Sequence, residues 1–157
     1  MIDDQPALTI RLASPDDISA INELDRYSNS PTRNIHRDIE KYFGSIDPST
    51  HEHSYIFLAE IAGQAVAKVE LMLPSSEAAS QEGYIRRVVV HPAHRGKGLA
   101  KQLMQYVIDF ARHTGKVDAV DLHVWESNQA AIRLYEALGF TLQHRELYYR
   151  LPFEGVD

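Results

Sequence analysis

The sequence contains no cysteine. This absence excludes disulfide bonds, metal sites built from cysteine and a cysteine nucleophile. The sequence also has no apolar run of 18 residues and no basic segment followed by an apolar one at its start, so we expect neither membrane insertion nor secretion. The expected location is the cytoplasm, and no membrane partner is predicted.

Positive charge is in the minority, with 16 Lys and Arg residues against 22 Asp and Glu residues and a net charge of −6 at pH 7. This overall charge repels nucleic acid. The clearest basic cluster consists of Arg86, Arg87, Arg95, Lys97 and Lys101. Its short span suits a nucleotide-sized ligand better than a nucleic-acid duplex, so no nucleic-acid partner is expected.

The length and composition are those of one globular domain. A chain of 157 residues with 44% hydrophobic and 24% charged residues can bury about 70% of the surface that its unfolded form exposes. No low-complexity linker divides the sequence. We therefore expect a single domain over residues 1–157, of the α/β (α+β) class.

The first half of the chain combines strand and helix patterns. Alternating polarity predicts a strand over 7–12, and a hairpin is predicted over 54–61 and 64–73 with its turn at Ala62-Gly63. A capping box at 14–17 predicts a first helix, and a second helix is predicted over 32–43. The predicted inner faces are Ile18, Ile21 and Leu24 in the first helix, and Ile35, Ile39 and either Tyr42 or Phe43 in the second.

The second half of the chain repeats this alternation. The predicted strands are 82–90, 117–124, 140–143 and 147–151, the second of them buried and the last two antiparallel. The predicted helices start after Gly98 and after Ser127 or Asn128, and they end at Gly115 and Gly139. Their apolar faces are Leu99, Leu103, Val107, Phe110 and Ala111 in the first, and Ala131, Leu134, Tyr135 and Leu138 in the second. A βα unit near position 90 between hairpins implies a mixed sheet with one parallel contact, between the fourth and fifth strands.

The stretch 88–101 carries the clearest functional signal. Three valines at 88–90 predict a buried strand, which Pro92 ends. Gly96 and Gly98 then let the backbone approach a ligand at the start of a helix, where unpaired N–H groups and the helix dipole favour an anion.

Arg95, Lys97 and Lys101 add positive charge around this turn, so a phosphate or pyrophosphate is the predicted ligand. The alternative is a βα turn softened by glycine, with solvated lysines. The spelling excludes two other phosphate loops. A nucleoside-triphosphate loop needs Gly-Lys followed by Ser or Thr, but Lys97 is followed by Gly98. A dinucleotide-binding fingerprint needs a third glycine at the position of Lys101.

Two motifs resemble those of the GNAT superfamily of N-acyltransferases. Arg95-x-x-Gly98-x-Ala100 resembles the family's acyl-CoA-binding signature. The segment 128–140 is similar to the family's Asn-x-x-Ala-x-x-x-Tyr-x-x-x-Gly-Phe pattern. Two motifs in this order are more specific than either alone. The resemblance covers 82–140, and the first third of the chain carries no matching motif.

This resemblance implies a GNAT-like fold, with a mixed, mostly antiparallel sheet, splayed parallel fourth and fifth strands and helices on both faces. Acetyl-CoA would be the co-substrate, and its pantetheine arm would bond the backbone of Val88 and Val90. No metal is implied, and His51-Glu52-His53, which offers two histidines without a third ligand, is predicted to be a loop. The residues that the resemblance assigns to acetyl-CoA are Val88, Val89, Val90, Arg95, Gly96, Lys97, Gly98, Leu99, Ala100, Lys101, Asn128 and Tyr135.

Attack of an amine on a thioester needs a neutral amine. Lysine-like amines titrate near about pH 10.4, so a base or a desolvating pocket must remove the proton at neutral pH. Some family members carry a glutamate at the position of Tyr84. Here Glu82, two residues earlier, is the candidate base, and the alternative is a solvated carboxylate at a strand start. Glu70, His123 and Glu126 are competing candidates.

Two residues of the second motif have two interpretations each. The tyrosine that matches Tyr135 in the family protonates the leaving thiolate, which makes Tyr135 the candidate acid; otherwise Tyr135 is a core residue. Asn128 is either a helix N-cap alone or also a hydrogen-bond partner of the cofactor.

These observations favour an N-acetyltransferase that transfers an acetyl group from acetyl-CoA to a primary amine by direct attack in a ternary complex. The alternative is a non-catalytic, regulatory module that binds an acyl-CoA or a nucleotide. The expected acceptor is a small-molecule or peptide amine, and the protein is expected to be a monomer or a homodimer. Arg86, on the same strand face as Tyr84, hints at an acceptor that bears a carboxylate.

Overall fold

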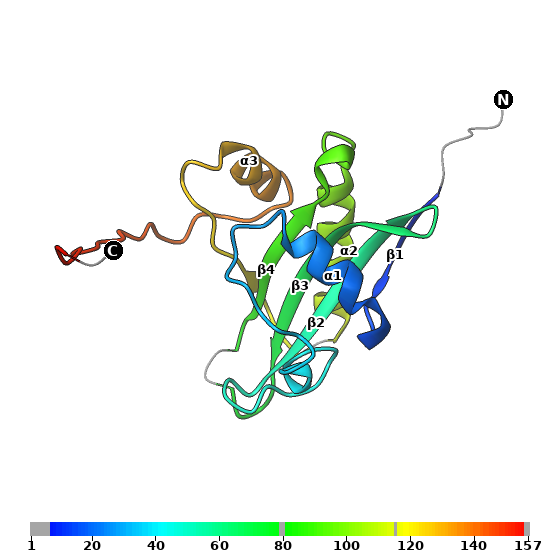
Figure 1. Cartoon of the computed structure of the whole chain (residues 1–157), viewed down its shortest axis with the longest axis horizontal. Helices are drawn as coiled ribbons and strands as arrows, with labels where there is room; N and C mark the ends of the chain where they lie inside the picture. The colour runs from blue at the N-terminus through cyan, green and yellow to red at the C-terminus, as the bar shows by residue number, and fades with distance from the viewer. Residues whose placement is uncertain (1–6, 79–80, 115, 156–157) are drawn as a thin grey trace. The chain divides into compact units, whose positions relative to one another are not determined.

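The computed structural model describes residues 7–78, 81–114 and 116–155 of the chain (Figure 1). The chain divides into two compact units, Met1–Trp125 and Glu126–Asp157. The first unit holds a sheet and two α-helices, and the second holds one α-helix. Within the described ranges, no helix has both the length and the apolar character that crossing a membrane requires.

The sheet of the first unit has five strands in the order β1-β2-β3-β4-β5 (Figure 1). The first four strands pair antiparallel, and β4 and β5 pair parallel. The strands are β1 Leu8–Leu12, β2 Glu52–Ile61, β3 Gln64–Pro74, β4 Gly83–Val90 and β5 Val120–Asp121. The predicted mixed sheet with one parallel contact is therefore confirmed. The loop predicted at 51–53 is wrong for Glu52 and His53, because they pair with Pro74 and Leu73 and so extend β2.

The turn between β2 and β3 follows the prediction. Ala62 and Gly63 both have left-handed backbones, with φ of 52° and 77°. Two successive positive φ values are typical of the tight hairpin turn whose twist matches that of antiparallel strands. This turn sets the register in which Ile61 faces Gln64.

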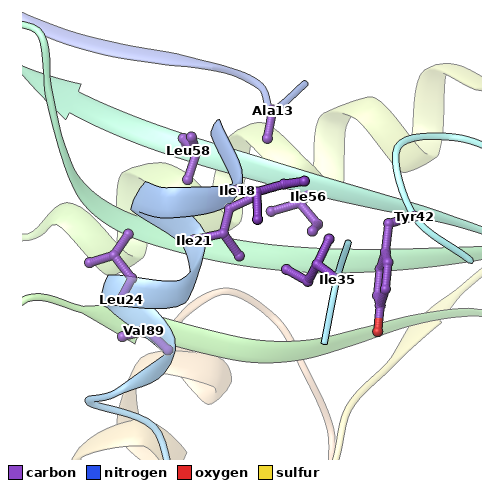
Figure 2. Packing of buried hydrophobic residues seen from close by; sticks show 9 residues of the cluster. All are labelled: Ala13, Ile18, Ile21, Leu24, Ile35, Tyr42, Ile56, Leu58 and Val89. Atoms are coloured by element: carbon purple, nitrogen blue, oxygen red, sulfur yellow. The ribbon is translucent and has the colours of Figure 1, made fainter. Parts of the chain in front are cut away.

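One face of the sheet is covered by α1 (Ile18–Asp25), as Figures 1 and 2 show. The predicted capping box precedes it in a 3-10 turn at Pro15–Asp17, where the Ser14 hydroxyl accepts from the Asp16 N–H and the Asp17 carboxylate accepts from the Ser14 N–H. The apolar cluster on this face consists of Ala13, Ile18, Ile21, Leu24, Ile35, Tyr42, Ile56, Leu58 and Val89 (Figure 2). The predicted inner face of α1 is confirmed.

The other face is covered by α2 (Leu99–Thr114) (Figure 1). Its buried residues are Leu99, Leu103, Met104, Val107 and Ala111. Phe110 packs edge-on against Phe57 and Tyr55 of β2, with ring centroids 5.0 and 5.3 Å away. The predicted end of this helix at Gly115 lies outside the described residues.

The predicted second helix is wrong. Residues 32–43 form turns and a single 3-10 turn at Ile39–Lys41. The Asn34 side chain accepts the N–H of Arg37, a local bond that competes with helix formation. Ile35 is buried as predicted, but Ile39 is 41% exposed because the segment lacks the helical period that would have turned it inward.

The strands predicted after α2 differ from those observed. The strand expected over 117–124 is only the two residues of β5, and its residues are half-buried or exposed, because it lies at the sheet edge and pairs with β4 alone. In the described part of the second unit, 140–143 and 147–151 form no strand. Alternation gives a segment strand character, but a strand forms only where a neighbour takes its hydrogen bonds.

The second unit contains α3 (Gln129–Ala137), as predicted. Gly139 follows the helix with φ of 101°, a left-handed conformation that ends the helix. The apolar side chains of the chain beyond it are largely exposed. They are Leu142, Leu147, Tyr148, Tyr149, Leu151 and Phe153.

A buried group of charges lies between β3 and the end of α1. Glu70 accepts from Nη1 of Arg33 at 2.6 Å and from Nζ of Lys68 at 2.8 Å. Lys68 and Arg33 also contact Asp25, at 2.8 and 3.0 Å. Lys68 and Glu70 are fully buried, so each charge depends on its partners for the solvation that it has lost.

Glu70→Gln should lower the free energy of unfolding at neutral pH by about 3 kcal/mol or more, because it leaves Arg33 and Lys68 buried with too few carboxylates. Burial alone would raise the pKa of Glu70, but its bonds to Arg33 and Lys68 outweigh burial and lower it. A lowered folded-state pKa means stability that is present above the unfolded value of 4.5 and is lost as the pH falls. The variant should therefore lose less stability than the parent between pH 7 and pH 3, in urea titrations.

Glu23→Gln is the matched control, because Glu23 pairs with Arg26 at the surface of α1. It should change the free energy of unfolding by less than about 0.5 kcal/mol. Equal effects of the two substitutions would contradict the importance of the buried charges.

Candidate functional site

A bulge in β4 shapes the centre of the candidate site. Val89 lies opposite Lys68, and Arg86 lies opposite Glu70. Between these two pairs β4 has one residue more than β3. Arg87 has φ of 53° in the bulge, a left-handed conformation that is uncommon outside glycine. The bulge bends β4 just before its last residues.

Beyond its start, β4 leaves β5. The two strands pair only at Gly83 with Val120 and at Tyr84 with Asp121. Within the described residues, no strand pairs with that edge of β4 from 85 to 90, and backbone polar groups at such an edge can bond an extended ligand. The predicted splay of the fourth and fifth strands is confirmed. The Val90 carbonyl at this edge accepts a bond from Nε of Arg95, at 3.2 Å.

The predicted phosphate turn, residues 95–98, follows β4 after a 3-10 turn at Pro92–His94. Gly96 and Gly98 have φ of 79° and 76°, and a Cβ built on either would meet no protein atom within 4 Å. The left-handed backbone accounts for glycine here, and the open space beside it can take a ligand. Leu99 then begins α2, whose first N–H groups have no partner within the helix.

Positive charge surrounds this turn as predicted. Arg95, Lys97 and Lys101 are exposed. Nζ of Lys97 lies 3.2 Å from Nδ1 of His94, and desolvation together with the charge of Lys97 lowers the pKa of His94. A neutral His94 can accept a hydrogen bond from Lys97. The turn therefore has the geometry and charge that a phosphate group needs.

The candidate bases of the first unit occupy different surroundings. Glu82 is exposed and directly precedes β4, which begins at Gly83 and not at Glu82. Glu70 is held in the buried ion pairs, which lower its pKa and make it a weak base. A hydrogen bond of 2.6 Å joins the Tyr84 hydroxyl to Nδ1 of His123.

The Tyr84–His123 contact was not predicted. The signal that could have found it is the parallel pairing of β4 with β5. Tyr84 lies opposite Asp121, and His123 follows Asp121 by two residues, which returns the chain to the same side. The sequence shows both strands but does not give their register.

The second unit holds the remaining candidates. Asn128 caps α3, since its Oδ1 accepts from the Ala131 N–H at 3.2 Å, and the N-cap interpretation is confirmed. The Tyr135 ring packs edge-on against Phe140, with centroids 5.9 Å apart. Burial raises the pKa of Tyr135, so its phenol stays protonated at neutral pH. Glu126 is exposed and pairs with Arg145 at 3.4 Å.

Comparison with known proteins bears on this combination of motif, splayed strands and glycine turn. The model of the acetyltransferase (GNAT) family matches residues 18–140. The chain belongs to this family. The match includes α1, the sheet from β2 to β5, the phosphate turn and α3.

One relative is the catalytic subunit NAA20 of the N-terminal acetyltransferase B complex of Arabidopsis thaliana, 35% identical over 104 residues, which are 66% of this chain and 60% of that protein. Another is the L-methionine sulfoximine/L-methionine sulfone acetyltransferase of Salmonella typhimurium, 49% identical over 55 residues, 35% of this chain and 32% of that protein. In both comparisons the matched region spans 60% or less of the relative's length.

Among solved structures, AAC(6')-Iy in complex with the bisubstrate analog CoA-S-monomethyl-acetylneamine has a TM-score of 0.72 and 20% identity, over 94% of this chain and 99% of that one. At this identity the likeness shows the fold alone.

Gly98→Asp should weaken CoA binding about a hundredfold, because it places a negative charge where the phosphate turn expects an anion. Gly98→Asn is the matched control. Asn has the same shape without the charge and tolerates a left-handed backbone, so its CoA affinity should stay within about tenfold of the parent. Calorimetry measures both affinities, and thermal melts check the fold. If the parent and a folded Gly98→Asp protein bind CoA with equal affinity, the turn at 95–98 does not bind the phosphates of CoA.

Proposed function

We propose that this chain transfers an acetyl group from acetyl-CoA to a primary amine, by direct attack in a ternary complex. The observation that carries the proposal is that the edge of β4 beyond Tyr84, which pairs with no described strand, leads directly into an open, positively charged glycine turn. An elongated molecule with amide groups at one end and phosphates at the other matches these two features in their order along the chain.

Bound acetyl-CoA supplies an acyl group activated as a thioester. The N–H groups at Gly96, Gly98 and the first turn of α2 would hold its pyrophosphate, with Arg95 and Lys97 contributing charge. The backbone at Val88 and Val90 would hold the pantetheine arm. Asn128, beside its role as N-cap, would donate its side-chain amide to the same arm.

Glu82 would take the proton from the amine, directly or through a water molecule. Glu82 lies directly before β4 and is exposed to solvent. The Tyr84–His123 pair is the second candidate, because its hydrogen bond places a titratable nitrogen at the point where β4 and β5 separate. Tyr135 would give its phenolic proton to the leaving sulfur, and its raised pKa keeps that proton available at neutral pH.

Turnover of acetyl-CoA with a panel of amines, amino acids, polyamines and peptide N-termini tests the function. Release of free thiol that depends on the amine supports it, and mass spectrometry identifies the acetylated product. CoA binding without acyl transfer to any member of the panel would favour a regulatory binding module instead.

Tyr135→Phe should lower kcat about 10²-fold on the first active amine and leave CoA affinity unchanged, since it removes one oxygen and the proton that it carries. Tyr149→Phe is the matched control, because Tyr149 is 84% exposed in the same unit. It should leave kcat within about twofold of the parent. Steady-state kinetics separate the two, and equal kcat values for all three proteins would leave Tyr135 as a packing residue.

Glu82→Gln should lower kcat/KM about 10²-fold at neutral pH, with the loss reduced at high pH, where the amine is already neutral. His123→Gln, which breaks the contact with Tyr84, is the comparison. Profiles of kcat/KM against pH distinguish the two residues. If the pH profile of kcat/KM is unchanged in Glu82→Gln and loses its rise with pH in His123→Gln, the base is His123.

A further inference from the structure

The β4 bulge turns two successive arginines toward the same side of the sheet. In a regular strand Arg86 and Arg87 would point to opposite faces. Here Nε of Arg86 lies 3.8 Å from Oε1 of Glu70, while Nη1 of Arg87 lies 4.0 Å from Oδ2 of Asp25. Arg87 also donates to the carbonyl of Pro31 at 3.0 Å. Both arginines thus join the buried charges on the α1 side.

This cluster has more positive than negative charge. Among the groups joined by these ion pairs, the carboxylates are Asp25 and Glu70 and the cations are Arg33, Lys68, Arg86 and Arg87, so the cations outnumber the carboxylates by two. Burial and the neighbouring charge of Arg33 lower the pKa of Arg87. An excess of like charge in a poorly solvated place is unfavourable, and an arriving anion relieves it.

Arg86 is the member of the cluster that a ligand can reach. Its side chain is 41% exposed, against 0% for Lys68, 7% for Arg33 and 12% for Arg87. Within the described ranges its one ion-pair contact is the 3.8 Å approach to Glu70, which is too long for a hydrogen bond. Its donors are therefore available for the two-pronged bond that a guanidinium forms with a carboxylate.

A small pocket adjoins Arg86. Its volume is about 50 Å³, and Ser54, Lys41 and Arg86 contribute donors to its lining. Ser54 is 2% exposed, and its hydroxyl has no hydrogen-bond partner among the residues that the structure describes. Glu52 and Asp47 also line the pocket, and Asp47 already accepts the N–H of Ser49. This volume exceeds what a cavity needs to hold one water molecule, and it suits a group of carboxylate size.

We propose that the amine acceptor carries a carboxylate, and that Arg86 binds this carboxylate with the Ser54 hydroxyl beside it. The proposal rests on the acetyl transfer proposed above and adds the chemical class of its acceptor. Arg86 stands two residues along β4 from Tyr84, about 7 Å away, on the same face of the strand. An acceptor held there would have its amine within reach of Glu82 or His123.

Paired acceptors that differ only in the carboxylate test this proposal. One pair is a free L-amino acid and its amide, and the other is a peptide with Asp as its second residue and the same peptide with Asn there. The parent should prefer the acid of one pair by at least about tenfold in kcat/KM. A preference in the first pair alone identifies amino acids as the source of the carboxylate, and a preference in the second alone identifies acidic peptides.

Arg86→Gln should abolish this preference mainly through KM, while kcat/KM for the amide stays within about twofold of the parent. Arg86→Lys should keep part of the preference, since it retains the charge without the fork. Ser54→Ala should reduce the preference more weakly. Arg112→Gln is the matched control, because Arg112 is 71% exposed on α2. This substitution should leave kcat/KM unchanged for both the acid and the amide.

Two results would overturn the proposal and leave acetyl transfer intact. One is a parent that uses acid and amide equally in both pairs. The other is an Arg86→Gln protein that loses activity on acid and amide to the same extent, which would make Arg86 a structural residue. Absence of acetylation of every amine, despite CoA binding, would instead refute the proposed function, and the acceptor class with it.

Discussion

The extra residue in β4 is the constraint on which the rest of the site depends. β4 has one residue more than β3 at the bulge, and Arg87 there has a left-handed conformation. The bulge turns Arg86 and Arg87 toward the same side of the sheet, where they approach Glu70 and Asp25. β4 pairs with β5 only as far as Tyr84, so the rest of that edge pairs with no strand in the part of the chain that the structure describes. The bulge therefore lies between the edge of β4 that pairs with no described strand and the group of buried charges.

The buried charges contact this bulge, since Nζ of Lys68 donates to the Arg87 carbonyl at 3.3 Å. Fully buried Lys68 and Glu70 would be costly in isolation, and they hold Arg33 and Asp25 in turn. Arg33 also stacks over the ring of Tyr42, 5.0 Å from its centroid. These contacts fix the irregular segment after α1 without a helix. The contacts are ion pairs with defined partners, at a buried place where apolar side chains could also have packed.

The two units differ in how they hold their functional candidates. In the first, the phosphate turn and the β4 edge lie next to one another in the chain, so local geometry is enough to bring them together. In the second, Asn128 and Tyr135 share α3, where the cap and the helical repeat set their spacing. Local order within each unit therefore accounts for both halves of the family's sequence pattern.

Local features were determined by the sequence itself. The Ala62-Gly63 turn, the Ser14 capping box, the Asn128 cap and the glycines of the phosphate turn all follow from what single residues do to their own backbone. The mixed sheet followed from the order of these elements, and the family from two motifs with the right spacing.

Tertiary structure decided what depends on distant partners. The bulge requires the register of β3 against β4, the Tyr84–His123 bond requires that of β4 against β5, and the charge cluster joins Asp25, Arg33 and Glu70 across the fold. The helix predicted over 32–43 failed for the same reason. Its apolar spacing is helical, but side-chain bonds of Asn34 and Arg33 to neighbours near and far outweigh a weak local preference.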